Sequence, residues 1–249
     1  MAHLYTSSDL KQYRLIAADG DLGSIEDFCV EQWNWAVRYL VVDTGKWLAN
    51  RKILVSPIAV GNIYDQDSTI DIELTKWQLE HSPVLEQKST ISRQYEDLYH
   101  KHLNWAPYWT ATEAEPRSLA TSEIIAEQAE PDTPSDGENH LKCETELRGF
   151  AMRARGQQAG SVDGIIIDSY YWVVRYLIVD VQQWLPAKTI ILSPEWITEL
   201  DWTRRYINVD ISGDVMSSAP AYDETQPLSQ QYEIDLYKHY GMSYYGDVS

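Results

Sequence analysis

An internal repeat with a spacing of 137 residues constrains the fold of this chain more than any other feature. Val37–Asp43 reads VRYLVVD, and Val174–Asp180 reads VRYLIVD. Other matched pairs at the same spacing are Trp35 with Trp172, Trp47 with Trp184, Ser56-Pro57 with Ser193-Pro194, and Gln94–Glu96 with Gln231–Glu233. This spacing far exceeds the 20–50 residues of stacking repeats, so each copy is a whole small domain. A chain of 249 residues is long enough for two.

The composition divides the chain into three parts. Residues 1–109 hold the first copy, residues 147–249 hold the second, and residues 110–146 lie between them. The middle part carries ten acidic side chains against Arg117 and Lys142, within a chain of net charge −18. Such a segment buries too little apolar surface to offset chain entropy. We therefore expect an acidic, flexible linker.

Short strands separated by turns dominate each copy. Ile70, Ile72 and Leu74 alternate with acidic residues, the pattern of a half-buried strand. Several such strands favour an all-β barrel or sandwich. Near the end of each copy, helical spacing behind a serine N-cap predicts a helix, from Ser92 to His102 and from Ser229 to Tyr240. The prediction is a mainly β protein with two tandem small β-barrels, each with a short C-terminal helix.

The two cysteines and the N-terminus bear on the compartment. Cys29 and Cys143 do not have the spacing of metal ligands or of a redox motif. Because Cys143 lies at the end of the acidic linker, we expect no bridge between them. Few cysteines suit a reducing compartment. No signal peptide and no run of ~20 apolar residues is visible, so a cytoplasmic location without a transmembrane segment is expected.

Motifs that would indicate catalysis or a bound cofactor are missing from the sequence. It shows no Ser/His/Asp order, glycine-rich phosphate loop or paired-cysteine site. We therefore expect no enzyme activity, no cofactor and no metal. The chain has no basic block, which argues against direct binding of nucleic acid.

Several charged residues recur in both copies. They are Arg38, Asp43 and Glu96 in the first copy, and Arg175, Asp180 and Glu233 in the second. Charges near a core persist when they are paired, so we interpret these residues as structural pairs, with Arg38 bonded to Asp43 or Glu96. The alternative is an enzyme with a charged cleft between the two barrels, built from Arg38, Glu96, Arg175 and Glu233.

The aromatic residues suggest a binding role. The chain has ten Trp and 17 Tyr but two Phe, and Trp and Tyr are enriched at protein interfaces. Core filling and sugar stacking are the alternatives. The candidate interaction residues follow the two C-terminal helices: Trp105, Tyr108, Trp109, Tyr244 and Tyr245.

The segment Arg38–Leu48, followed by Ser56-Pro57, resembles the PRC-barrel family, as does Leu147–Phe150 at the start of the second copy. This family includes the cytoplasmic domain of the photosynthetic reaction-centre H subunit and a domain of a ribosome-maturation factor. The resemblance implies two small β-barrels of a soluble, tandem type. Together with the repeat, it predicts a non-enzymatic protein-interaction or assembly module, and an assembly factor for a ribosomal or photosynthetic complex is a further alternative. The expected partner is another protein or a second copy of the chain, with peripheral membrane contact through a partner left open.

Overall fold

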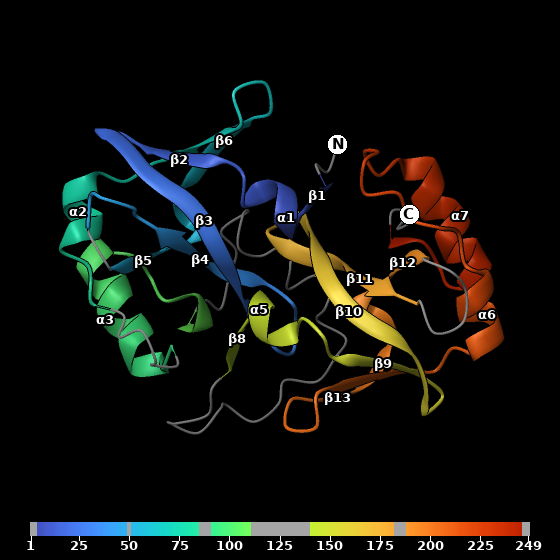
Figure 1. Cartoon of the computed structure of the whole chain (residues 1–249). Helices are drawn as coiled ribbons and strands as arrows, with labels where there is room; N and C mark the ends of the chain where they lie inside the picture. The colour runs from blue at the N-terminus through green and yellow to red at the C-terminus, as the bar shows by residue number, and fades with distance from the viewer. Residues whose placement is uncertain (1–3, 49–50, 85–90, 111–139, 182–187, 246–249) are drawn as a thin grey trace. The chain divides into compact units, whose positions relative to one another are not determined.

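The structure of this chain is a computed structural model that describes residues 4–48, 51–84, 91–110, 140–181 and 188–245 (Figure 1). The chain forms two compact units. The first-repeat unit comprises Ser8–Thr145 and Ser169–Val173. The second-repeat unit comprises Met1–Ser7, Glu146–Asp168 and Val174–Ser249.

The first-repeat unit is built on a seven-stranded sheet with the order β5-β4-β3-β2-β7-β6, to which β8 adds by pairing with β3. Its strands are β2 (Arg14–Ala17), β3 (Gly20–Glu31), β4 (Val37–Asp43), β5 (Lys52–Val55), β6 (Val60–Tyr64), β7 (Thr69–Ile72) and β8 (Leu141–Cys143). Its helical segments include η1 (Pro57–Ala59), α2 (Lys76–Glu80), α3 (Arg93–Leu103) and η2 (Tyr108–Thr110). Among the described strands of this unit, β2 and β7 are the one parallel pair, and Phe28, Tyr39 and Leu40 are fully buried in the core.

The second-repeat unit repeats this plan, with the sheet order β12-β11-β10-β9-β14-β13 and β1 paired to β10. Its strands are β1 (Leu4–Thr6), β9 (Ala151–Ala154), β10 (Gln157–Asp168), β11 (Val173–Asp180), β12 (Thr189–Leu192), β13 (Ile197–Asp201) and β14 (Tyr206–Val209). Its helical segments are η3 (Pro194–Trp196), α6 (Gly213–Ser218) and α7 (Gln230–Tyr240). Two short helices, α1 (Ser7–Leu10) and α5 (Glu144–Leu147), span the boundaries between the units.

The mainly β prediction is confirmed, but closed barrels are not seen: in the described residues, both sheets are open hydrogen-bonded paths. The two longest helices lie where the sequence predicts them. The Ser92 and Ser229 side chains accept hydrogen bonds from the backbone N–H groups of Tyr95 and Tyr232, both at 3.2 Å. Helices also occur away from the C-terminal end of each copy. No helix within the described ranges has the length and apolar character needed to cross a bilayer.

A reciprocal exchange of strands joins the two copies. Strand β1 lies at the start of the first copy but pairs with β10 of the second, with Tyr5 opposite Ile167 (Figure 1). Strand β8 precedes the second copy but pairs with β3 of the first, with Lys142 opposite Val30. Met1–Ser7 therefore belongs to the second-repeat unit, and the first-repeat unit extends to Thr145. The expected linker 110–146 contains β8 and the start of α5, and its residues 111–139 lie outside the described ranges.

Each sheet contains one glycine that permits close backbone packing. Gly23 in β3 has a φ of +119°, and a Cβ there would overlap the carbonyl oxygen of Asp43. Gly160, its equivalent in β10, stands in the same relation to Asp180. Such positions admit glycine because backbone atoms cannot yield to an added methyl group.

We therefore expect Gly23→Ala to lower the free energy of unfolding by about 3 kcal/mol or more. Gly45→Ala is the matched control, because Gly45 also has a positive φ, +56°, but a Cβ there meets nothing within 4 Å. That control should lose about 1 kcal/mol. Urea denaturation of both variants checks the difference, and equal losses would show that the overlap at Gly23 is relieved at no cost.

Candidate functional site: a buried carboxylate cluster

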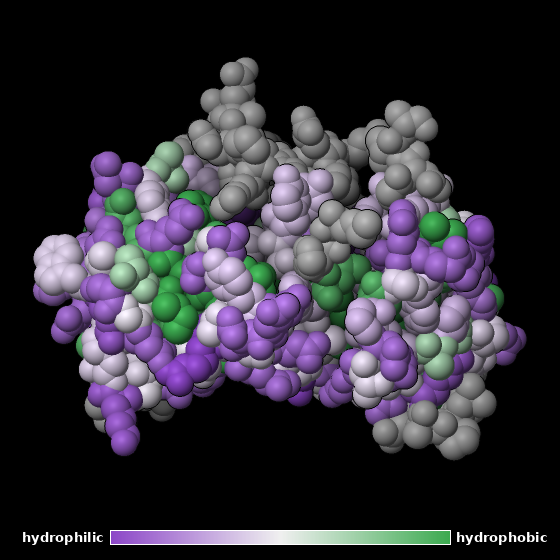
Figure 2. Space-filling view, turned by 90° about the horizontal axis from the view of Figure 1, so that it is seen from above, coloured by the Kyte–Doolittle hydropathy of each residue, from purple (hydrophilic) through white to green (hydrophobic). Residues whose placement is uncertain are grey.

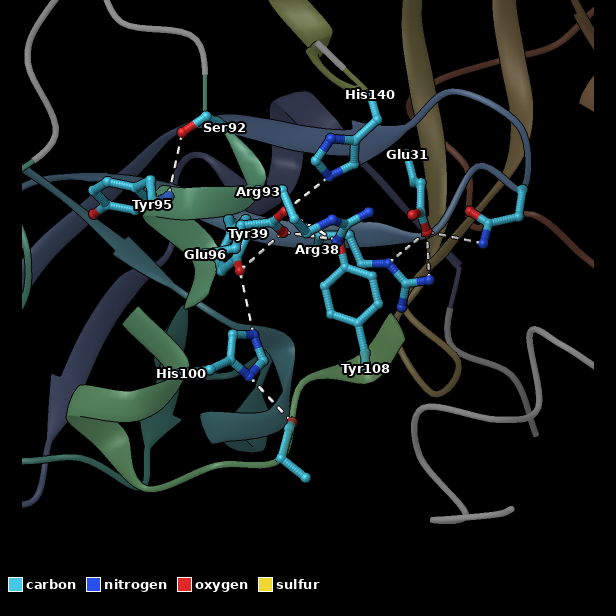
Figure 3. A network of polar contacts seen from close by, with 12 residues as sticks. Glu31, Arg38, Tyr39, Ser92, Arg93, Tyr95, Glu96, His100, Tyr108 and His140 are labelled. Carbon is cyan, nitrogen blue, oxygen red and sulfur yellow. Dashed lines mark hydrogen bonds and ion pairs between the residues drawn. The ribbon is translucent and has the colours of Figure 1, made fainter. Parts of the chain in front are cut away.

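The most developed polar site in the first-repeat unit is centred on Glu96, in the first turn of α3 (Figure 3). Its side chain is fully buried. The hydroxyls of Tyr39 and Tyr108 donate to its Oε1 at 3.1 and 2.8 Å. Its Oε2 lies 3.1 Å from Nη1 of Arg93 and 2.8 Å from Nε2 of His140. Groups from β4, α3, the segment after α3 and the residue before β8 therefore meet on one carboxyl group.

Burial sets the electrostatics of this cluster. A buried carboxylate is tolerated when several donors surround it, because desolvation otherwise disfavours the charged form. Desolvation, reinforced by the negative charge of Glu96, raises the pKa of Tyr39 well above its ordinary value. Desolvation also raises the pKa of Tyr108. Both phenols therefore stay protonated and act as hydrogen-bond donors across the physiological pH range.

Arg38 extends the cluster, with a partner that the sequence analysis did not name. Its Nε and Nη2 lie 2.8 and 2.5 Å from Oε2 of Glu31. The repeat predicts Asp43 or Glu96 as the partner of Arg38, and this prediction is wrong. Asp43 is instead exposed and accepts a hydrogen bond from the backbone N–H of Gly45 at 2.9 Å. The Arg38 guanidinium also lies over the ring of Tyr108, 3.9 Å from its centroid, so the ring shields the Glu31 ion pair.

The second-repeat unit contains an equivalent cluster around Glu233. The hydroxyls of Tyr176 and Tyr245 donate to its Oε1 at 2.7 and 2.6 Å. Arg175 Nε lies 3.1 Å from Oδ2 of Asp168. Asp168 therefore takes the place of Glu31, 137 residues further along the chain. The repeat contained this signal, because an acidic residue stands at the same position in both copies. Asp180 is half-buried at the end of β11.

The two clusters differ in their basic groups. Gln230 occupies the position of Arg93, and Tyr237 that of His100. Burial lowers the pKa of His100, whose Nδ1 lies 3.2 Å from the carbonyl oxygen of Ala106. His140 stacks on the ring of Trp33 at a centroid distance of 5.8 Å. The first cluster thus holds imidazole rings that sequence reasoning did not connect with Glu96, because His140 lies 44 residues away from it.

The five candidate interaction residues are half-buried and make contacts within their own units. Tyr108 and Tyr245 donate to the buried glutamates, and Trp109 lies under the guanidinium of Arg93 at 4.2 Å. Trp105 contacts the ring of Tyr99, and Tyr244 that of Tyr237. Each aromatic tail therefore covers the cluster of its own copy. Their binding to a partner stays a prediction.

The arrangement holds together elements that are distant in the sequence. Arg38 and Glu96 lie in the first-repeat unit, and Arg175 and Glu233 in the second. In each unit, a carboxyl group joins the helix, the aromatic tail and a central strand. Among the described residues, no group of three or more His, Cys, Asp or Glu side chains is arranged to hold a metal ion. The donors that surround each glutamate come from the protein itself, which is typical of a polar network that stabilises a core.

No protein-family model and no curated protein matches this chain.

Proposed function

We propose that the chain is a non-enzymatic protein-interaction module of PRC-barrel type, and that its first copy carries the surface that binds a partner. The proposal rests on a difference between the copies. At exposed positions where the second copy has a polar residue, the fold does not require an apolar side chain, so an exposed apolar residue there in the first copy calls for another explanation.

The proposed surface consists of Trp77, Val84 and Leu98, whose exposed fractions are 63%, 62% and 52%. Trp77 lies on α2, Val84 follows α2, and Leu98 lies on α3. Two hydrogen bonds join these elements on either side of Leu98. His102 Nε2 lies 2.7 Å from the carbonyl oxygen of Gln78, and the Tyr95 hydroxyl donates to Pro83 at 2.9 Å.

The spacing on α3 brings the three side chains toward the same surface. Residues 95, 98 and 102 lie on one face of a helix because they are three and four positions apart. Leu98 is therefore on the face that meets α2 and the segment after it. Trp77 adjoins Gln78, and Val84 adjoins Pro83, the two residues that this face contacts.

The equivalent positions in the second copy are the main support for the proposal. They hold Asp214, Ala221 and Asp235, and all three are exposed. The same fold therefore accepts aspartate where the first copy has Trp77 and Leu98. Because packing does not require apolar side chains there, their exposure to water is explained by a partner that covers them.

Figure 2 shows one face of the molecule on which hydrophilic residues predominate and apolar residues form small separate areas. Tryptophan is the residue type most typical of binding hot spots, where one side chain contributes a large part of the affinity. A small apolar surface centred on Trp77 therefore suits a specific protein contact.

The architecture supports the assignment to the PRC-barrel type. Both copies have the same strand order. In each copy one parallel pair, β2 with β7 or β9 with β14, joins the first hairpin to the last. The sequence resemblance covers both copies, and it groups the chain with proteins that work within larger assemblies. A barrel formed by curling of each sheet is part of this proposal.

The test replaces Trp77 and Leu98 together by aspartate, the residue that the second copy uses. We expect the tagged wild-type protein, purified from its own host, to retain a stoichiometric partner, and W77D/L98D to bind that partner at least ~30-fold more weakly. The melting temperature should change by less than about 2 °C, because both positions are exposed.

The matched control is D214A/D235A, which changes the same two positions of the second copy and should leave binding unchanged. Equal partner binding by W77D/L98D and the wild type would refute the proposed surface. If the wild type is a dimer in analytical ultracentrifugation and W77D/L98D is a monomer, the partner is a second copy of the chain.

A further inference from the structure

The two cysteines of the chain lie opposite each other in the first-repeat sheet. Cys29 in β3 pairs with Cys143 in β8, although 114 residues separate them. Their sulfur atoms are 3.1 Å apart. From the sequence, no bridge is expected, because Cys143 lies at the end of the acidic linker. The strand exchange removes that argument, since it places β8 directly beside β3.

The backbone hydrogen bonds show what kind of pair the cysteines form. The N–H of Gln32 donates to the carbonyl oxygen of His140 at 3.1 Å, so residues 32 and 140 form a hydrogen-bonded pair. The N–H of Glu31 donates instead to Ala36, on the side of β4. Pairs alternate along an antiparallel ladder, so Cys29 and Cys143, three positions from the first pair, form a non-hydrogen-bonded pair. In such pairs the Cα atoms are ~4.5 Å apart and the side chains are closest, which is within the range that a disulfide spans.

We propose that Cys29 and Cys143 form a reversible disulfide that fastens the exchanged strand β8 to β3. The second copy shows that the fold does not require sulfur at these positions. The equivalent residues, Ile166 and Thr6, are paired in the same register. The chain has two cysteines, and they occupy these two facing positions of the first copy. Since packing does not require cysteine there, we attribute their presence to the chemistry of the thiol groups.

Burial sets the order of the reaction. Cys143 is half-buried, whereas Cys29 is 1% exposed. The Cys143 thiolate attacks one sulfur of a low-molecular-weight disulfide such as oxidised glutathione, forms a mixed disulfide and releases one thiolate. The Cys29 thiolate then attacks the Cys143 sulfur and displaces the second thiolate. The protein loses two electrons and two protons, and the oxidant takes them up as two thiols.

The disulfide would stabilise the position of His140 in the carboxylate cluster around Glu96. His140, which contacts Glu96, immediately precedes β8. Thr145, just after β8, donates its hydroxyl to Asp27 at 2.5 Å. A disulfide between these two contacts would oppose local opening of β8 and thus keep His140 at Glu96. In the reduced protein, a strand of three residues is held by non-covalent contacts and opens more readily.

The test uses the full chain, reduced and then treated with an excess of oxidised glutathione. We expect a monomer whose mass is lower by two hydrogen atoms, with a peptide that links Cys29 to Cys143. The oxidised form should melt about 5–10 °C above the reduced form. Hydrogen exchange at Leu141–Cys143 should slow by at least ~10-fold, and reductant should reverse all three changes.

Cys143→Ala is the control, since it should give one melting temperature under both conditions. Three results would each overturn the proposal: both thiols remain reduced, a glutathione adduct on Cys143 persists, or the only product is a dimer linked between chains. Because the main experiment uses the wild-type sequence, a folding defect in the variant does not affect the conclusion.

Discussion

Tyr5→Pro is expected to destabilise the sheet of the second copy, although Tyr5 lies at the start of the first copy. Tyr5 lies opposite Ile167 in β10. Its equivalent, Lys142, lies opposite Val30 in β3. Val30 and Lys142 are two positions from the hydrogen-bonded pair of Gln32 and His140 and so form another such pair. Proline lacks the N–H that this position donates, so each substitution removes a ladder hydrogen bond and distorts the strand.

We expect each proline to lower the free energy of unfolding by about 2–4 kcal/mol, in opposite units. Hydrogen exchange followed by mass spectrometry should show faster exchange of β10 in Tyr5→Pro and of β3 in Lys142→Pro. Tyr5→Ala and Lys142→Ala control for the loss of the side chains. The strand exchange would be disproved if Tyr5→Pro increased exchange in β3 and left β10 protected.

Glu96→Ala is expected to destabilise the first-repeat unit strongly, because Glu96 is fully buried and holds several donors. It leaves the Arg93 guanidinium, the His140 ring and two tyrosine hydroxyls facing a cavity. Removing one partner of a buried ionic cluster costs about 3–5 kcal/mol. Glu96→Gln keeps an acceptor for the tyrosine hydroxyls but loses the charge that faces Arg93, so we expect a loss of about 1–3 kcal/mol.

The matched substitution in the second copy is Glu233→Ala. Tyrosine hydroxyls donate to Glu233, and glutamine replaces arginine at position 230. We expect about 2–3 kcal/mol, less than for Glu96→Ala, because no guanidinium is left unpaired. Urea denaturation combined with hydrogen exchange measures both losses and assigns each to its unit. A Glu96→Ala protein as stable as the wild type would mean that water replaces the carboxylate and that the cluster contributes little to stability.

The elements that the sequence predicted well depend on local chemistry. Serine followed by helical spacing marked the starts of α3 and α7, and alternating residues such as Ile70 and Ile72 marked β7. Each of these signals depends on a few neighbouring residues, so it does not depend on how the rest of the chain folds.

The candidate site was predicted in part. The repeat singled out Arg38 and Glu96 with their equivalents, and both belong to polar clusters in which Glu96 is buried and Arg38 half-buried. The partner of Arg38 was missed because the sequence analysis weighed Asp43 and Glu96, whereas Glu31 lies on the neighbouring strand. The contact between His140 and Glu96 depends on the pairing of β8 with β3, for which no local pattern exists.

The sequence by itself determined the duplication, the mainly β architecture and the helix starts, because repeat spacing, residue alternation and capping are written along the chain. Only the tertiary structure decided which sheet each exchanged strand joins. Leu4–Thr6 and Leu141–Cys143 are equivalent strands, and either one offers the same backbone hydrogen bonds to β3 or β10. Which strand each of them pairs with therefore depends on the packing of the whole chain. The pairing of Leu141–Cys143 with β3 places Cys143 beside Cys29 and His140 beside Glu96.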